Sequence, residues 1–141
     1  MKYFSKVSAN GNNYQEIIDY VWDLVKNRNI ILLYGDLGSG KTFFVQRLLR
    51  CISDESVTSP TFSLVNLYNT HIGKIYHYDL YRVKHADELV NLDIYDAAQS
   101  MLMIVEWPEI AEKILLKFLD KIIRIEITGN AGNSRNYRID Y

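Results

Sequence analysis

The segment from Gly35 to Thr42 constrains this chain most, because it carries every fixed position of the phosphate-binding pattern G-x-x-x-x-G-K-[ST]. Glycines let the backbone wrap closely around a phosphate and direct successive N–H groups at it. The apolar run 29–34 before the loop predicts a buried strand. Residues 43–50 after it predict a helix whose N-terminus would add positive potential at the anion. This order favours a phosphate-binding loop over a chance glycine-rich turn.

The loop residues predict specific contacts with a bound nucleotide. Lys41 is expected to reach the terminal phosphates as a point charge, and the hydroxyl of Thr42 is a predicted ligand of Mg²⁺. The other predicted nucleotide contacts in this segment are Gly35, Asp36, Leu37, Gly38, Ser39, Gly40 and Phe43. The sequence therefore predicts a site for a nucleoside triphosphate and a divalent cation.

Composition favours one domain that covers residues 1–141 and has a single hydrophobic core. Hydrophobic residues make up 48% of the chain and charged residues 23%, and the formal net charge is −1. Binding to nucleic acid rests on neutralising phosphates, and no run of Lys or Arg occurs. The chain is therefore not expected to bind nucleic acid by itself.

Several features predict a cytoplasmic protein. The N-terminal residues lack the long apolar core of a signal peptide, and no apolar run has the length needed to span a bilayer. The single cysteine, Cys51, cannot form an internal disulfide, which fits a reducing compartment. Its position at the end of the apolar helix after the loop predicts a small side chain in the core.

Hydrophobic periodicity predicts helices and strands that alternate along the chain. Helices are expected at 13–26, 43–50, 86–100 (in one or two short pieces) and 109–119. Strands are expected at 29–34, 62–68, 74–81, 101–105, 121–127 and 136–141. Turns between neighbouring strands predict two hairpins and therefore antiparallel members of the sheet. The expected fold class is α/β, with three layers and a mixed, partly parallel sheet flanked by helices.

Glu106 follows the apolar run 101–105, which predicts a strand covered on both faces. In phosphate-loop proteins an acid on the metal side stands at the end of a strand next to the loop strand. The usual residue there is Asp, but the longer carboxylate of Glu can still reach Mg²⁺ directly or through a water. The sequence favours this role over a surface carboxylate at the end of a strand that Pro108 terminates.

Asp79 lies two residues after His77 on the same face of an aromatic-rich strand. A carboxylate in such surroundings needs a partner, because burying a lone charge is costly. The residues leave two readings open: an acid that orients water or supports the metal, and a structural residue paired with Arg82 or with the backbone. The histidines and Cys51 lack metal-ligand spacing, so His77 is predicted to be an ordinary strand residue.

Five segments together resemble one protein family. They are 34–42, 59–66 (Ser-Pro-Thr-Phe-Ser-Leu-Val-Asn), 77–82 (His-Tyr-Asp-Leu-Tyr-Arg), 87–89 and 105–109 (Val-Glu-Trp-Pro-Glu). In order and spacing, over roughly residues 13 to 127, the chain is similar to the TsaE family, small bacterial ATPases of tRNA threonylcarbamoyladenosine biosynthesis. The phosphate loop is common to many families, whereas the other segments together are highly specific.

This resemblance implies a P-loop NTPase fold, ATP and Mg²⁺ as cofactors, and a set of site residues. It implies that Lys41 holds phosphates, that Thr42 and Glu106 bind Mg²⁺, and that Asp79 is the acid needed for hydrolysis. The candidate catalytic residues are thus Asp79, Lys41 and Glu106. Further implied nucleotide contacts are Ser59 and Thr61 in a switch region, Trp107 beside the site, and Gly11 and Arg135 near the adenine. Phe43 stands where many members have a second threonine.

The resemblance also implies a partner. Members of this family act with a transferase built from the subunits TsaD and TsaB, which moves a threonylcarbamoyl group onto adenosine 37 of tRNAs that read codons starting with A. The family ATPase is required for repeated turnover of this complex and does not perform the transfer. Contact with tRNA is therefore expected to be indirect, and no membrane partner is expected.

Two other functions are compatible with the phosphate loop. A small-molecule kinase of the same fold would need an acceptor pocket and usually an arginine-rich lid, but the chain has no arginine-dense insertion. A nucleotide-gated binding module would need Lys41 but not Asp79. A non-hydrolysable ATP analogue would support the function of such a module as well as ATP does.

Overall fold

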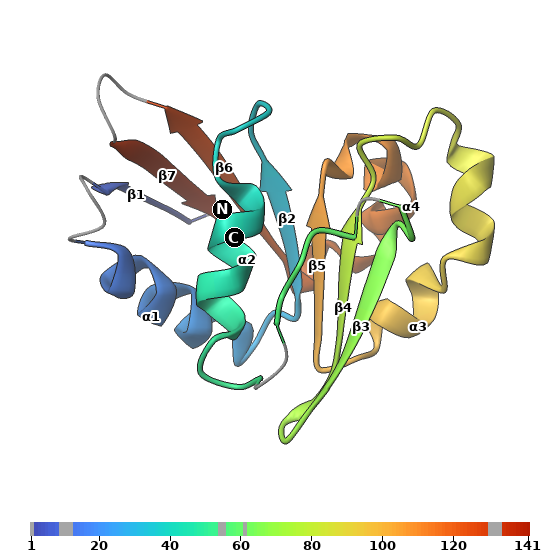
Figure 1. The fold of residues 1–141 in the computed structure, drawn as a ribbon, viewed down its shortest axis with the longest axis horizontal. Coiled ribbons are helices and arrows are strands. Elements are labelled where there is room, and N and C mark those ends of the chain that lie inside the picture. Colours follow the sequence, from blue (N-terminus) through green and yellow to red (C-terminus); the bar gives the residue numbers. More distant parts are fainter. Residues whose placement is uncertain (1, 9–12, 54–55, 61, 130–133) are drawn as a thin grey trace.

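A mixed sheet of seven strands, in the order β1-β7-β6-β2-β5-β4-β3, forms the centre of the computed structural model (Figure 1). The structure describes residues 2–8, 13–53, 56–60, 62–129 and 134–141, and of residues 3–8 the backbone alone. The strands are β1 (Tyr3–Ser8), β2 (Ile30–Tyr34), β3 (Val65–Thr70), β4 (Gly73–Asp79), β5 (Leu102–Glu106), β6 (Ile122–Gly129) and β7 (Arg135–Asp140).

The four central strands are parallel. β2 pairs with β5 on one side and with β6 on the other, and β5 also pairs with β4. The remaining pairs, β3 with β4, β6 with β7 and β1 with β7, are antiparallel, which confirms both predicted hairpins. Because the central strands run in the same direction, their carboxyl ends meet at one edge of the sheet, where open α/β sheets bind ligands.

Helices cover both faces of the sheet (Figure 1). One face packs against α1 (Tyr14–Val25) and α2 (Lys41–Leu49). The other packs against η1 (Ala86–Asn91), α3 (Ile94–Ala98), η2 (Pro108–Ala111), α4 (Glu112–Leu115) and η3 (Leu116–Lys121), where η marks a 3₁₀ helix. The three-layer α/β class is therefore confirmed.

Each face of the sheet has its own core, because alternate residues of a strand point to opposite sides. On the side of α1 and α2, Leu33 and Ile104 pack with Phe44 and Leu48. All five residues of β5 are buried, which confirms a strand covered on both faces.

In the described part of the chain, no helix is long and apolar enough to cross a membrane.

Several predicted elements differ from the structure. The helix expected at 109–119 is broken into η2, α4 and η3, and Phe118 has non-helical angles (φ −119°, ψ 26°). The strand expected from residue 62 starts only at Val65, since Leu64 has a positive φ of 64° and donates its N–H to the carbonyl of Pro60. β1 was not predicted. It is held by tertiary pairing with β7, and such pairing outweighs local strand propensity.

Cys51 is exposed, so the prediction of a core position is wrong. The buried face of α2 is formed by Phe44, Val45, Leu48 and Leu49. α2 ends at Leu49, and Cys51 lies in the turn that follows, so the helical periodicity does not place it in the core.

Gly35 joins β2 to the loop in a conformation that leaves no space for a side chain. Its φ is 153°, and an added Cβ would lie 2.5 Å from Oγ of Ser39 and 2.7 Å from the carbonyl oxygen of Ile127. Gly38 also has a positive φ, 76°, but a Cβ there would meet no atom within 4 Å. Two features thus require glycine at position 35: its positive φ and the backbone of β6 next to it.

We expect Gly35→Ala to destabilise the fold more than Gly38→Ala. Both changes place alanine at a positive φ, which costs roughly 1–2 kcal/mol, but only Gly35→Ala also forces the Ile127 backbone to move. The expected loss of unfolding free energy for Gly35→Ala is about 3 kcal/mol or more. Urea denaturation of both variants measures the difference, and equal losses would contradict this account of the loop.

Candidate nucleotide-binding site

The loop 35–40 lies at the carboxyl end of β2 and leads directly into α2. Gly38 and Gly40 have positive φ values of 76° and 102°, and the N–H of Ser39 donates to the carbonyl of Asp36 at 3.0 Å. The first N–H groups of a helix have no partner within the helix. The curved loop and the start of α2 therefore form a concave surface suited to an anion.

Lys41, the first residue of α2, is only 6% exposed. Its ammonium group donates to the carbonyl oxygens of Gly35 and, at 3.1 Å, of Asp36, and lies 4.1 Å from the ring centroid of Trp107. Among the described residues, no carboxylate forms an ion pair with it. The ammonium group is therefore held by backbone oxygens and an aromatic face, and no carboxylate of the described residues is ion-paired with it.

Burial lowers the pKa of Lys41, because the charged form loses solvation inside the protein. Nearby carboxylates oppose this shift, the largest opposing effects coming from Glu106 and then Asp79. A bound phosphate would act in the same direction as these carboxylates. Burying the charged form of Lys41 thus costs free energy, and a bound phosphate would offset part of that cost.

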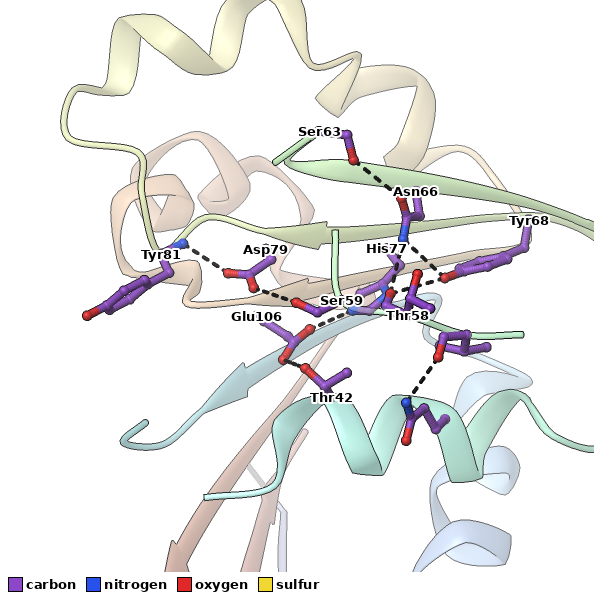
Figure 2. A network of polar contacts seen from close by, with 12 residues as sticks. Thr42, Thr58, Ser59, Ser63, Asn66, Tyr68, His77, Asp79, Tyr81 and Glu106 are labelled. Carbon is purple, nitrogen blue, oxygen red and sulfur yellow. Dashed lines mark hydrogen bonds and ion pairs between the residues drawn. The ribbon is translucent and has the colours of Figure 1, made fainter. Parts of the chain in front are cut away.

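Thr42 and Glu106 bring two oxygen ligands together. The hydroxyl of Thr42 donates to Oε1 of Glu106 at 2.9 Å, across the gap between α2 and the end of β5 (Figure 2). Glu106 is 2% exposed, so the alternative of a surface carboxylate is wrong. Mg²⁺ prefers oxygen ligands and usually takes only one or two from the protein besides phosphates and waters. The pair fits such an ion.

A metal centre made of protein side chains alone is not present in the described ranges: no three His, Cys, Asp or Glu side chains there converge as ligands. A divalent cation beside Thr42 and Glu106 would therefore complete its shell with nucleotide phosphates and water.

Asp79 ends β4 in direct register with Glu106 of β5. Its Oδ2 accepts a hydrogen bond from Oγ of Ser59 at 3.1 Å, and its Oδ1 accepts one from the backbone N–H of Tyr81 at 3.1 Å (Figure 2). The guanidinium of Arg82 lies instead 4.9 Å from the ring of Phe62. The sequence suggests two structural partners for Asp79, which are Arg82 and the backbone. The backbone is the one that contacts its carboxylate.

His77 contacts the site, although the sequence predicts only an ordinary strand residue. It is fully buried, and its Nε2 lies 2.6 Å from Oε2 of Glu106 (Figure 2). The alternation of side chains along β4 puts His77 and Asp79 on the face that α2 covers. This alternation, together with parallel pairing of β4 and β5, would have predicted the contact between His77 and Glu106.

Two adjoining cavities surround the loop. A cavity of about 450 Å³ is lined by Lys41, Thr42, Ser59, Asp79 and Glu106, among others. A second, of about 650 Å³, shares the loop and Trp107 with the first and extends to Tyr34, Thr128 and Arg135.

The remaining predicted contacts lie at different places around the loop. Nε of Arg135 donates to the carbonyl of Ser39 at 3.2 Å, so β7 also contacts the loop. Phe43 is 51% exposed and packs edge-on against Tyr14 of α1, with ring centroids 5.3 Å apart. Leu37 is 68% exposed. Gly11 and Thr61 lie outside the described residues.

Comparisons with known proteins agree on one family. The family model for "Threonylcarbamoyl adenosine biosynthesis protein TsaE" matches residues 8–137. A tRNA threonylcarbamoyladenosine biosynthesis protein TsaE from Rickettsia typhi is 39% identical over 111 residues, which cover 72% of this chain and 77% of the relative. The protein of the same name from Aquifex aeolicus is 36% identical over 127 residues, 88% of this chain and 86% of that one.

A solved structure supports the fold. The crystal structure of Bacillus subtilis YdiB is similar with a TM-score of 0.65 and 22% identity, over 98% of this chain and 84% of that chain. Since the family model spans most of the residues and the relatives extend over most of the chain, this protein belongs to the TsaE family of tRNA threonylcarbamoyladenosine biosynthesis proteins.

Proposed function

We propose that this chain is a Mg²⁺-dependent ATPase that serves tRNA threonylcarbamoyladenosine biosynthesis, with residues 1–141 acting as one nucleotide-binding domain. The observation that carries the proposal is the convergence of Lys41, Thr42, Glu106 and Asp79 on one cavity at the carboxyl edge of the parallel strands. Phosphoryl transfer needs a phosphate cradle, a metal-side acid and a group that orients the attacking water. These four residues match those requirements.

Binding of ATP would use the loop backbone and Lys41. The ammonium group would exchange the carbonyl oxygens of Gly35 and Asp36 for phosphate oxygens, which carry more negative charge. Attraction between opposite charges is stronger at a buried position than in water, so the desolvation of Lys41 favours this exchange. The nucleoside would extend into the 650 Å³ cavity, toward Arg135.

A Mg²⁺ ion held by Thr42 and Glu106 would neutralise charge that develops on the transferred phosphoryl group. The protein's contribution is to keep a hydroxyl and a carboxylate oxygen side by side before the ion arrives. Glu106 is anchored in a fully buried strand, and Thr42 in the first turn of α2. Both ligands therefore lie on rigid elements.

Asp79 would act on the attacking water. Its carboxylate lines the 450 Å³ cavity and is oriented by the hydroxyl of Ser59 and by the N–H of Tyr81. A carboxylate fixed in this way can accept a hydrogen bond from a water and direct its lone pair at the terminal phosphate. Ser59 links this acid to the proposed switch region, residues 59–62.

The proposed partner is the TsaD–TsaB transferase complex, for which ATP hydrolysis would allow repeated turnover. Contact with tRNA would then occur through that complex, in the cytoplasm. A kinase has less support, because Arg82 is the single arginine among the residues that line the 450 Å³ cavity in the described part of the chain.

The proposal is tested by measuring phosphate release from Mg·ATP by the purified chain, alone and with TsaD–TsaB. We expect slow release that rises with the complex. Lys41→Ala should reduce it about a hundredfold or more, because the phosphates lose their buried cation. ATP binding without release in either condition would contradict an ATPase and favour a gated module. A phosphorylated product from nucleoside or sugar acceptors would instead indicate a kinase.

Asp79→Asn distinguishes hydrolysis from nucleotide-gated binding. The amide keeps the size of the side chain but is a much weaker base, so we expect ATP affinity to change less than about threefold and hydrolysis to fall about a hundredfold or more. Asp96→Asn, the same change on the exposed side of α3, is the matched control. Unchanged hydrolysis in Asp79→Asn would make Asp79 a structural residue.

A further inference from the structure

One buried polar side chain next to the site has no role in the proposed function so far. His77 lies on the face of β4 that α2 covers, and it is fully buried. On one side its imidazole stacks on the ring of Tyr68, with centroids 6.4 Å apart and planes inclined by 26°. On another side its Nε2 lies 2.6 Å from Oε2 of Glu106. The ring thus contacts both Tyr68 of the outermost strand β3 and the carboxylate of Glu106.

The surroundings of the ring indicate which nitrogen carries the proton. Nδ1 of His77 is buried and has no hydrogen-bond partner among the described residues. An N–H group at Nδ1 would therefore be buried without an acceptor, which is unfavourable. A proton on Nε2, in contrast, is donated directly to the carboxylate. The arrangement favours the Nε2–H tautomer, with His77 as the donor.

Glu106 consequently has a different partner for each carboxylate oxygen. Oε2 accepts from His77 in the interior of the sheet, and Oε1 accepts from Thr42 on the side of the phosphate loop (Figure 2). A glutamate side chain has one more rotatable bond than an aspartate, so a strand end alone restricts its carboxylate less. With Oε2 occupied, the rotation that would turn Oε1 away from Thr42 breaks a buried hydrogen bond.

We propose that His77 is a positioning residue, which holds Glu106 by Oε2 so that Oε1 stays beside the Thr42 hydroxyl, where a nucleotide-bound Mg²⁺ would meet it. The inference rests on the proposed function, because it takes Glu106 as the acid on the metal side. It predicts that His77 acts on the metal-dependent part of nucleotide binding and leaves the metal-free part unchanged.

Replacement of His77 by two amides of different length tests this role. In His77→Gln the amide nitrogen lies about where Nε2 lies, so it can still donate to Oε2, whereas the amide of His77→Asn is too short to reach it. The measured quantity is the ratio of ATP affinities in Mg²⁺ and in EDTA, determined by calorimetry. His71→Asn, in the exposed turn between β3 and β4, is the control for the same substitution elsewhere.

We expect the Mg²⁺ enhancement to fall about tenfold in His77→Asn, as for loss of one hydrogen bond to a charged group, and to be largely retained in His77→Gln and His71→Asn. Affinity in EDTA should stay within about twofold throughout. Full enhancement in His77→Asn, or equal loss in both His77 variants, would overturn the inference. If the unmodified chain binds ATP without any Mg²⁺ enhancement, the proposed metal role of Glu106 fails first.

A second measurement needs no substitution and therefore does not depend on the folding of a variant. In the chain labelled with ¹⁵N-histidine, NMR distinguishes a proton on Nε2 from one on Nδ1. We expect a slowly exchanging Nε2 proton for His77 that persists when Mg·ADP is added. A proton on Nδ1 instead, or loss of the Nε2 proton in the complex, would overturn the role of His77 as donor.

Discussion

Parallel pairing of β2, β5 and β4 is the constraint on which the site depends. The register places Leu33, Glu106 and Asp79 side by side at the carboxyl ends of three strands. The loop leaves β2 at this edge and returns in α2, so Lys41 and Thr42 face the two acids. Lys41 and Glu106, which are 65 positions apart in the sequence, thus line one cavity because the strands pair in this register and the loop returns to the same edge.

A cation and a carboxylate are both buried near this edge of the sheet. Lys41 and Glu106 are both nearly inaccessible. Backbone oxygens and an indole contact the cation, and a hydroxyl and an imidazole contact the carboxylate. Contacts of this kind stabilise a charge that has little access to water. The site is therefore suited to a ligand that carries both signs, as a metal–nucleotide complex does.

Much of this arrangement could be predicted from local sequence. The phosphate loop has a fixed spacing, and a run of five apolar residues before Glu106 is enough to predict a buried strand next to it. The contact between His77 and Glu106 could not be predicted in this way, because it depends on which strands are neighbours and in which register. β1 was missed for a similar reason, since only its pairing with β7 holds it. Cys51 was misplaced because α2 ends two residues before it, at Leu49.

The central claim is that Thr42 and Glu106 form the metal side of a nucleotide site. It is tested most directly by a crystal structure of the chain with ADP and Mn²⁺, in which anomalous scattering locates the ion. The account predicts an ion between the Thr42 hydroxyl and the Glu106 carboxylate, with His77 still donating to Oε2. An ion bound elsewhere, with the hydrogen bond from Thr42 to Glu106 unchanged, would contradict it.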